Sequence, residues 1–197
     1  VFLLWVGWFG FNGGSTFAVS ERIPLIIANT ALGGIAGGLA GLLAAWIWLR
    51  KPVVDRIING VIAGLVSITA SAHVLHPLDA LIVGAIGSGI SVSVMALLVR
   101  LEIDDAIGVV PVHFAAGFWG VVAVAIFVSP HVLGTGLDAW SQLQIQLIGA
   151  FCVGTFAFVV AYFGLRVLNH WLPLRVSTES ERIGLNVSEH GATNALL

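Results

Sequence analysis

One histidine stands inside a stretch of sequence that is long and apolar enough to cross a membrane. His113 is followed by the apolar run 114–128 and is preceded by Pro111. Burying an ionisable group in hydrocarbon costs several kcal/mol unless it has a partner or a water-filled cavity, so such a histidine is a candidate functional residue. Because a neutral imidazole has one donor and one acceptor nitrogen, it could pass a proton or bind a small polar solute. The plainer interpretation is a core histidine with satisfied hydrogen bonds.

Two acids and a proline accompany this histidine. Asp104 and Asp105 could form a solvated turn, or at least one of them could cap the helix that carries His113. We favour a cap, because a carboxylate at a helix N-terminus accepts hydrogen bonds from free N–H groups and complements the helix dipole. Pro111 removes one backbone donor and leaves a carbonyl near Ile107 without its usual partner. We therefore expect an irregular helix beside His113.

Composition indicates that these residues belong to a membrane protein. The 197 residues are 58% hydrophobic and 9% charged, with a mean hydropathy of +1.04, which excludes an ordinary soluble globular domain. A net charge of −2 and eight scattered Lys and Arg residues give no sign of a nucleic-acid-binding face. The single cysteine, Cys152, cannot form a disulfide within the chain or a metal site with a second thiol. No cofactor or metal is expected.

Hydropathy divides the chain into six candidate membrane spans, since a transmembrane helix needs about 20 mostly apolar residues. We predict an all-α membrane protein, with a transmembrane domain at 1–168 and a cytoplasmic tail or linker at 169–197. If the first loop faces outward, every basic residue except Arg22 falls on the cytoplasmic side, which places the C-terminus in the cytoplasm. The six spans are 1–18, 25–49, 57–74, 79–99, 107–128 and 139–165.

Small residues predict close contact between two of these spans. Glycines recur at four-residue spacing between Gly33 and Gly41, and Gly60 and Gly64 lie one helical turn apart. Such spacing lets helix backbones approach each other in lipid, where packing drives association. A structural role is favoured for both stretches.

Two further clusters have plain interpretations. Trp8 and Phe11 belong to a group of aromatic residues in the first span that could form a belt at the membrane interface. His73 and His76 are three residues apart and could share a helical face. A metal site would need further ligands, so we favour solvated loop histidines.

Four motifs resemble those of the ammonium transporter family, which includes the Rhesus-type channels. They occur in the family's order and cover nearly the whole chain, although each alone would be a weak signal. The motifs are Gly7 to Ser15 (GWFGFNGGS), Asn59 to Val66 (NGVIAGLV), Asp104-Asp105 with Val112-His113, and Gly184 to Gly191 (GLNVSEHG).

The resemblance implies an eleven-helix subunit built from two inverted five-helix repeats and a final helix, assembled as a homotrimer with one pore in each subunit. This chain is similar to the second repeat, the final helix and the tail. The first of the family's two pore histidines belongs to the earlier repeat, which this sequence does not contain. Because the chain starts without Met inside an apolar run, we expect it to be part of a longer protein.

The resemblance also assigns roles to particular residues. Phe11 would gate the outer pore mouth, with Trp8 and Ser15 beside it in the ammonium-binding site, and His113 would be the second pore histidine. An aromatic face attracts a desolvating cation by about 0.5 to 2 kcal/mol, and a serine oxygen can accept an N–H bond. Moving the intact ammonium ion into an apolar pore would cost far more free energy than these contacts contribute. Deprotonation at the mouth is therefore favoured, with separate passage of ammonia and proton and His113 as the relay.

The predicted function is ammonium transport through a bilayer, in the plasma membrane, with a regulatory PII protein as a candidate partner. The alternative is an ammonium-sensing membrane module coupled to a signalling domain, because the chain continues beyond Gly191 through the helix-compatible stretch 192–197. An intramembrane enzyme is disfavoured, since no Asp or Glu lies in the middle of a span to assist His113. The sequence departs from the family's pattern at Gly108 and Asn186, where aspartates are usual, and at the atypical His73 and His76.

Overall fold

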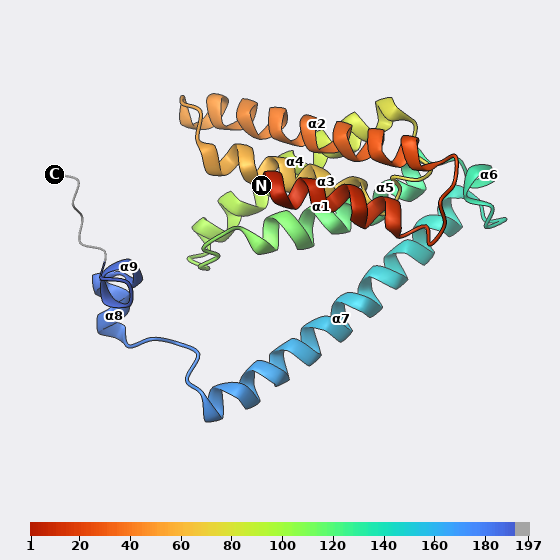
Figure 1. The fold of residues 1–197 in the computed structure, drawn as a ribbon. Coiled ribbons are helices and arrows are strands. Elements are labelled where there is room, and N and C mark those ends of the chain that lie inside the picture. Colours follow the sequence, from red (N-terminus) through yellow and green to blue (C-terminus); the bar gives the residue numbers. More distant parts are fainter. Residues whose placement is uncertain (192–197) are drawn as a thin grey trace. The chain divides into compact units, whose positions relative to one another are not determined.

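The computed structural model describes residues 1–191, and these residues are almost entirely helical (Figure 1). They form two compact units that divide between Ala150 and Phe151, inside a helix. The domain boundary expected at 168 stays a prediction, and the two units are described separately. The first unit contains α1 (Phe2–Gly14), α2 (Ile23–Leu49), α3 (Val54–Thr69), α4 (Pro77–Arg100), the π-helix η1 (Val110–Ala115), α5 (Ala116–Phe127), α6 (Pro130–Leu133) and the start of α7 (Ala139–Trp171).

Four helical segments are long and apolar enough to cross a membrane: α2, α4, η1 together with α5, and α7. With 13 and 16 residues, α1 and α3 are shorter than the about 20 residues that a crossing needs. Helices thus occur in all six predicted spans, but only four reach crossing length among the described residues. The last helix, α7, continues past the predicted limit at 165 to Trp171 and includes Arg166.

The central helix of the first unit is α3, which packs against α1, α2, α4, η1 and α5. Its contact with α2 is made by backbone against backbone. A Cβ atom at Gly37 would lie 2.2 Å from the carbonyl oxygen of Gly60, and a Cβ atom at Gly64 would lie 2.2 Å from that of Gly33. Only glycine fits at such positions, which confirms the close packing predicted from the spacing of small residues.

Polar side chains fix the turn between α3 and α4. The Asn29 amide of α2 donates hydrogen bonds to the carbonyl oxygens of Ala72 (2.9 Å) and Leu75 (2.8 Å). These bonds hold the turn against α2, and α3 therefore ends at Thr69, before the predicted limit at 74. The Nδ1 atom of His76 accepts a bond from the Leu78 amide (3.3 Å), so this histidine caps α4.

Apolar side chains of different sizes fill the space between α2, α3, α4 and α5. The most deeply buried residues of this core are Ile26, Ile68, Ala72, Leu75, Ala80, Val83, Ala123 and Val128. The core holds the helices that frame the candidate site, while several helix faces outside it carry exposed apolar side chains. Exposed apolar faces on helices of this length are typical of a protein embedded in lipid.

The second unit contains the end of α7 and the short helices α8 (Thr178–Ile183) and α9 (Leu185–Ser188). The Leu174 amide donates to Oδ1 of Asn169 (2.9 Å) just beyond α7. The predicted helix-compatible stretch 192–197 lies outside the described residues.

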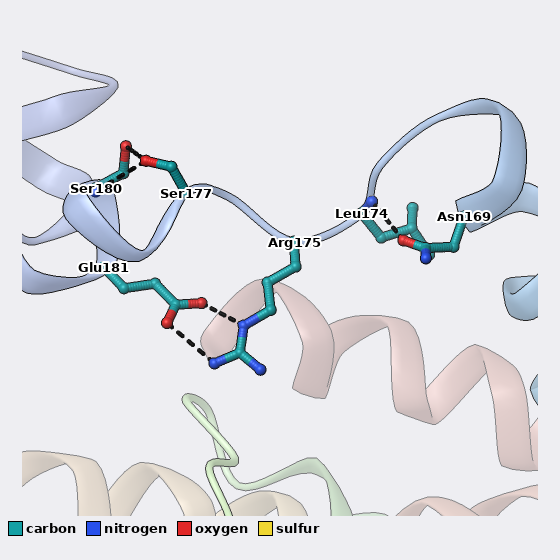
Figure 2. A network of polar contacts seen from close by, with 6 residues as sticks. All are labelled: Asn169, Leu174, Arg175, Ser177, Ser180 and Glu181. Atoms are coloured by element: carbon teal, nitrogen blue, oxygen red, sulfur yellow. Dashed lines mark hydrogen bonds and ion pairs between the residues drawn. The ribbon is translucent and has the colours of Figure 1, made fainter.

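A bidentate ion pair links the segment before α8 to that helix (Figure 2). Arg175 donates from Nε to Oε1 of Glu181 (2.5 Å) and from Nη2 to Oε2 (2.9 Å). The hydrogen bonds from Arg175 hold the pKa of the Glu181 carboxyl below its usual value. The Ser177 hydroxyl caps α8 by accepting from the Ser180 amide (3.1 Å). These contacts give the predicted tail a local fold.

Candidate functional site

An open groove of about 400 Å³ brings together three of the residues selected from the sequence. Trp8 and Phe11 come from α1, and His113 comes from η1. The groove runs along one face of α3 and continues onto α5. Its other lining residues are Val66, Thr69, Ala70, Gly117 and Val121. The lining is mostly apolar, with the imidazole, the indole and one hydroxyl as its polar groups.

His113 occupies the widened turn of a π-helix. The irregularity expected beside Pro111 is confirmed, and its form is η1, in which Pro111 and Val112 are buried and His113 is exposed. His113 is exposed because the groove that it lines is open in the part of the protein that this chain forms. What the described residues supply is one wall, with the histidine on its surface.

Asp105 holds the start of this helix. Its carboxylate oxygens accept hydrogen bonds from the amides of Val109 and Val110, both at 2.8 Å. Gly108 adopts a φ of +75°, and a Cβ atom there would lie 2.5 Å from the Met95 methyl group. The positive φ would strain any other residue at this position, and a side chain there would have to displace the Met95 methyl group, so the backbone favours the glycine found here. Asp104 is exposed and makes no hydrogen bond or ion pair with the described residues.

The two aromatic rings of the groove are positioned by α3. The indole Nε1 of Trp8 donates to the Thr69 hydroxyl (2.9 Å), which itself donates to the Leu65 carbonyl oxygen (2.7 Å). Phe11 meets Trp8 edge to face, with ring centroids 5.9 Å apart, and remains 57% exposed. The hydrogen bond fixes Trp8, and Trp8 in turn supports Phe11. An exposed ring held in this way can face a cation.

Ser15 lies outside this groove, in a neighbouring one of about 470 Å³ that shares Thr69 and Ala70 with it. Its hydroxyl donates to the Phe11 carbonyl oxygen (2.6 Å). The hydroxyl is therefore bonded to the backbone of its own helix, and its oxygen lone pairs can still accept a further hydrogen bond. Arg22 and His73 line the same groove, and the Arg22 charge would oppose a cation bound there.

Helical spacing from His113 indicates Gly117, but the sequence did not single out Val121 or the part of the groove that α3 supplies. Val66, Thr69 and Ala70 share a helical face because they are three and four residues apart, and Gly117 and Val121 follow His113 at four-residue steps. Extending the helical stripe from His113 beyond Gly117 by one more turn would have found Val121. Nothing local marks Thr69 as the partner of Trp8. Among residues 1–191, no three His, Cys, Asp or Glu side chains gather to hold a metal ion.

Comparison with known sequences decides the family. The model of the Ammonium Transporter Family matches residues 1–195. This chain belongs to the ammonium transporter family. A putative ammonium transporter of Synechocystis sp. is 43% identical over 97% of this chain and 35% of its own length. Ammonium transporter Amt2 of Archaeoglobus fulgidus is 36% identical over 97% of this chain and 43% of its own length.

Solved structures of ammonium transporter relatives share the fold. A protein described as a sensor Amt protein superposes with a TM-score of 0.86 at 33% identity, covering 95% of this chain and 47% of that protein. Mep2 of Candida albicans gives a TM-score of 0.80 at 31% identity, covering 90% of this chain and 42% of that protein. This chain spans less than half the length of each of these four relatives. The family and the apolar helices support an integral membrane protein.

Proposed function

We propose that this chain supplies one wall of an ammonium-conducting pore. The observation that carries the proposal is the groove shared by Trp8, Phe11 and His113. The relatives named as ammonium transporters indicate that the substrate is ammonium. This ion is small, cationic and rich in hydrogen-bond donors. On this proposal the six helices match the second inverted repeat and last helix of an eleven-helix subunit, and the complete protein assembles as a homotrimer in the plasma membrane.

The chemistry follows from the order of groups in the two grooves. Ser15 offers an oxygen acceptor and Phe11 an aromatic face at the outer mouth, which draw ammonium out of bulk water. The groove beyond them is too apolar to carry the charge, so the ion loses its proton there and ammonia continues. His113 receives or relays that proton, because one imidazole nitrogen accepts while the other donates. The protein breaks no covalent bond other than N–H, which makes it a transporter and not an enzyme.

The test uses the full-length protein in proteoliposomes, with ammonium-dependent current and internal pH measured together. His113→Ala should reduce the flux or change the transported species while trimer assembly is unaffected, because the side chain lies on the groove surface and not in the core. His131→Ala is the matched control, since this histidine lies in α6 and lines neither groove. A variant that conducts like the wild type would refute the relay role. No ammonium transport by a correctly inserted trimer would refute the proposal itself.

A second candidate is an ammonium-sensing module whose pore drives a cytoplasmic output domain. It is favoured by the structural likeness to a protein described as a sensor. The coding sequence downstream of Leu197 separates the two. A kinase or cyclase domain there favours the sensor, whereas a stop codon favours a transporter regulated by a separate PII protein.

A further inference from the structure

The groove lined by Ser15 contains a charge that a binding site for ammonium alone does not explain. It has a volume of about 470 Å³ and lies between the end of α1, the loop before α2 and the turn after α3. Arg22 supplies a positive charge, and no Asp or Glu is among the described residues that line this groove. A cation drawn to the Ser15 oxygen would therefore meet a guanidinium whose charge is not balanced.

The Arg22 side chain has no partner between residues 1 and 191. It is exposed at the N-cap position of α2, and neither of the two ion pairs found in these residues includes it. Its guanidinium donates no hydrogen bond to them, and the carboxylate of the adjacent Glu21 does not pair with it. A guanidinium has five N–H donors and no acceptor. These donors are available to an anion that enters the groove.

The other polar groups of this groove divide into donors and acceptors. The imidazole of His73 makes no hydrogen bond with the described residues, and in its neutral form it offers one N–H donor. The hydroxyl hydrogens of Ser15 and Thr16 are already engaged by backbone carbonyl oxygens, at 2.6 Å and 2.9 Å. Both oxygens are thus left as acceptors. The groove therefore combines donors that suit an anion with acceptors that suit ammonium.

We propose that Arg22 and His73 bind a small inorganic anion, such as chloride, beside the ammonium that Ser15 accepts. Because the ammonium site is itself proposed, the anion site rests on the proposed function. Hydrogen bonds between a guanidinium and an anion are charge-assisted and stronger than neutral ones. With the anion bound, the groove holds a balanced pair of ions, and Arg22 no longer repels the arriving cation. A bulky anion would take the space that ammonium needs.

The two ions should strengthen each other's binding. Two like unit charges about 7 Å apart in water repel enough to weaken binding about threefold. We therefore expect chloride to raise the affinity for ammonium about threefold, by removing the repulsion from Arg22. By linkage, ammonium must raise the affinity for chloride by the same factor.

The first experiment detects the anion without requiring transport. It measures the linewidth of the chloride NMR signal with the full-length protein in detergent, while sodium chloride replaces sodium gluconate at constant ionic strength. We expect an excess linewidth that saturates and that Arg22→Gln removes. His73→Ala should shift saturation to higher chloride concentration. Ammonium should lower the chloride concentration for half saturation about threefold.

The second experiment measures the apparent KM for ammonium from the current through proteoliposomes. In the wild type, KM should be about threefold higher in gluconate than in chloride, with the same maximal current. Arg22→Gln should give the lower KM in both salts, because it removes the repulsion together with the anion site. Glu21→Gln is the matched control, since it changes the charge next to Arg22 without lining the groove. It should keep the full effect of chloride.

Several results would overturn the anion site. One is an excess chloride linewidth that is absent in the wild type or that Arg22→Gln leaves unchanged. Another is an equal KM in both salts, as expected if a carboxylate from another part of the complete protein neutralises Arg22. A KM of Arg22→Gln that still depends on chloride would indicate general screening. By contrast, the absence of current in every salt would refute the proposed function, and the linewidth would still decide whether the anion binds.

Discussion

The two sides of α3 differ in what they present to a neighbour. On one side, Gly60 and Gly64 let the backbone of α2 approach until no side chain fits between them. On the other side, Val66, Thr69 and Ala70 line an open groove whose aromatic and imidazole groups remain exposed. The glycine side of α3 is already packed against α2 of the same chain. The groove side is open, so a solute or another part of the pore wall can contact it. One helix thus separates the residues that hold the fold from those proposed to work on ammonium.

The largest expected effect concerns the glycine side of α3. Gly37→Ala places a methyl group 2.2 Å from the Gly60 carbonyl oxygen, which forces α2 away from α3. We expect the free energy of unfolding to fall by about 3 kcal/mol, at the upper end of the range for overpacked positions. Thermal unfolding of the purified protein measures it.

Gly89→Ala is the control for this substitution. Gly89 lies inside α4, and nothing beyond the local helix backbone lies within 4 Å of the position that a Cβ atom would take there. Alanine at this residue should leave the stability unchanged or raise it by up to about 1 kcal/mol. Equal effects of the two substitutions would remove the distinction between the two sides of α3.

The next effect concerns the cap below His113. Asp105→Ala removes the acceptors for the Val109 and Val110 amides and should destabilise the protein by about 1 to 2 kcal/mol. Asp104→Ala, next to it and exposed, should change the stability little. Unfolding of both variants is compared under the same conditions. If Asp104→Ala proved the more damaging of the two, the assignment of the cap would be wrong.

A smaller effect is expected on the groove side of α3. Trp8→Phe keeps the aromatic ring but loses the hydrogen bond to Thr69, which should cost about 0.5 to 1.5 kcal/mol. Trp140→Phe serves as the control, since Trp140 is 67% exposed and lies in neither groove. The loss is read from thermal unfolding. A larger loss than that of Gly37→Ala would show that the groove, and not the glycine contact, holds α1 and α3 in place.

The smallest effect lies outside both sides of α3, in the ion pair between Arg175 and Glu181. Because Arg175 lowers the pKa of Glu181 in the folded state, the pair stabilises α8 above the ordinary glutamate pKa of about 4.3. This contribution is lost as the pH falls through the lowered pKa. Amide exchange in α8 should be faster in Glu181→Gln than in the wild type at neutral pH, and the difference should vanish in acid. Glu179→Gln, in the same helix, should not change the exchange rate.

Sequence reasoning succeeded where a local pattern has a single structural outcome. The glycine spacing in α2 and α3 predicted their close contact, and Pro111 predicted an irregular helix. It failed where the outcome depends on distant residues. The hydrogen bond between Trp8 and Thr69, for example, joins segments 61 residues apart. The end of α3 likewise depends on Asn29, a residue of another helix.

The π-helix sets the rotational phase of everything that follows it. Its hydrogen bonds skip one residue more than those of an α-helix, so positions after Ala115 are advanced by one relative to those before Val110. One residue corresponds to about 100° of rotation in an α-helix. The phase of His113, Gly117 and Val121, which keep four-residue spacing along one face, is therefore changed relative to the residues before Val110. This change lets the three residues share the groove while Ala116 and Ala123 of the same helix face the core.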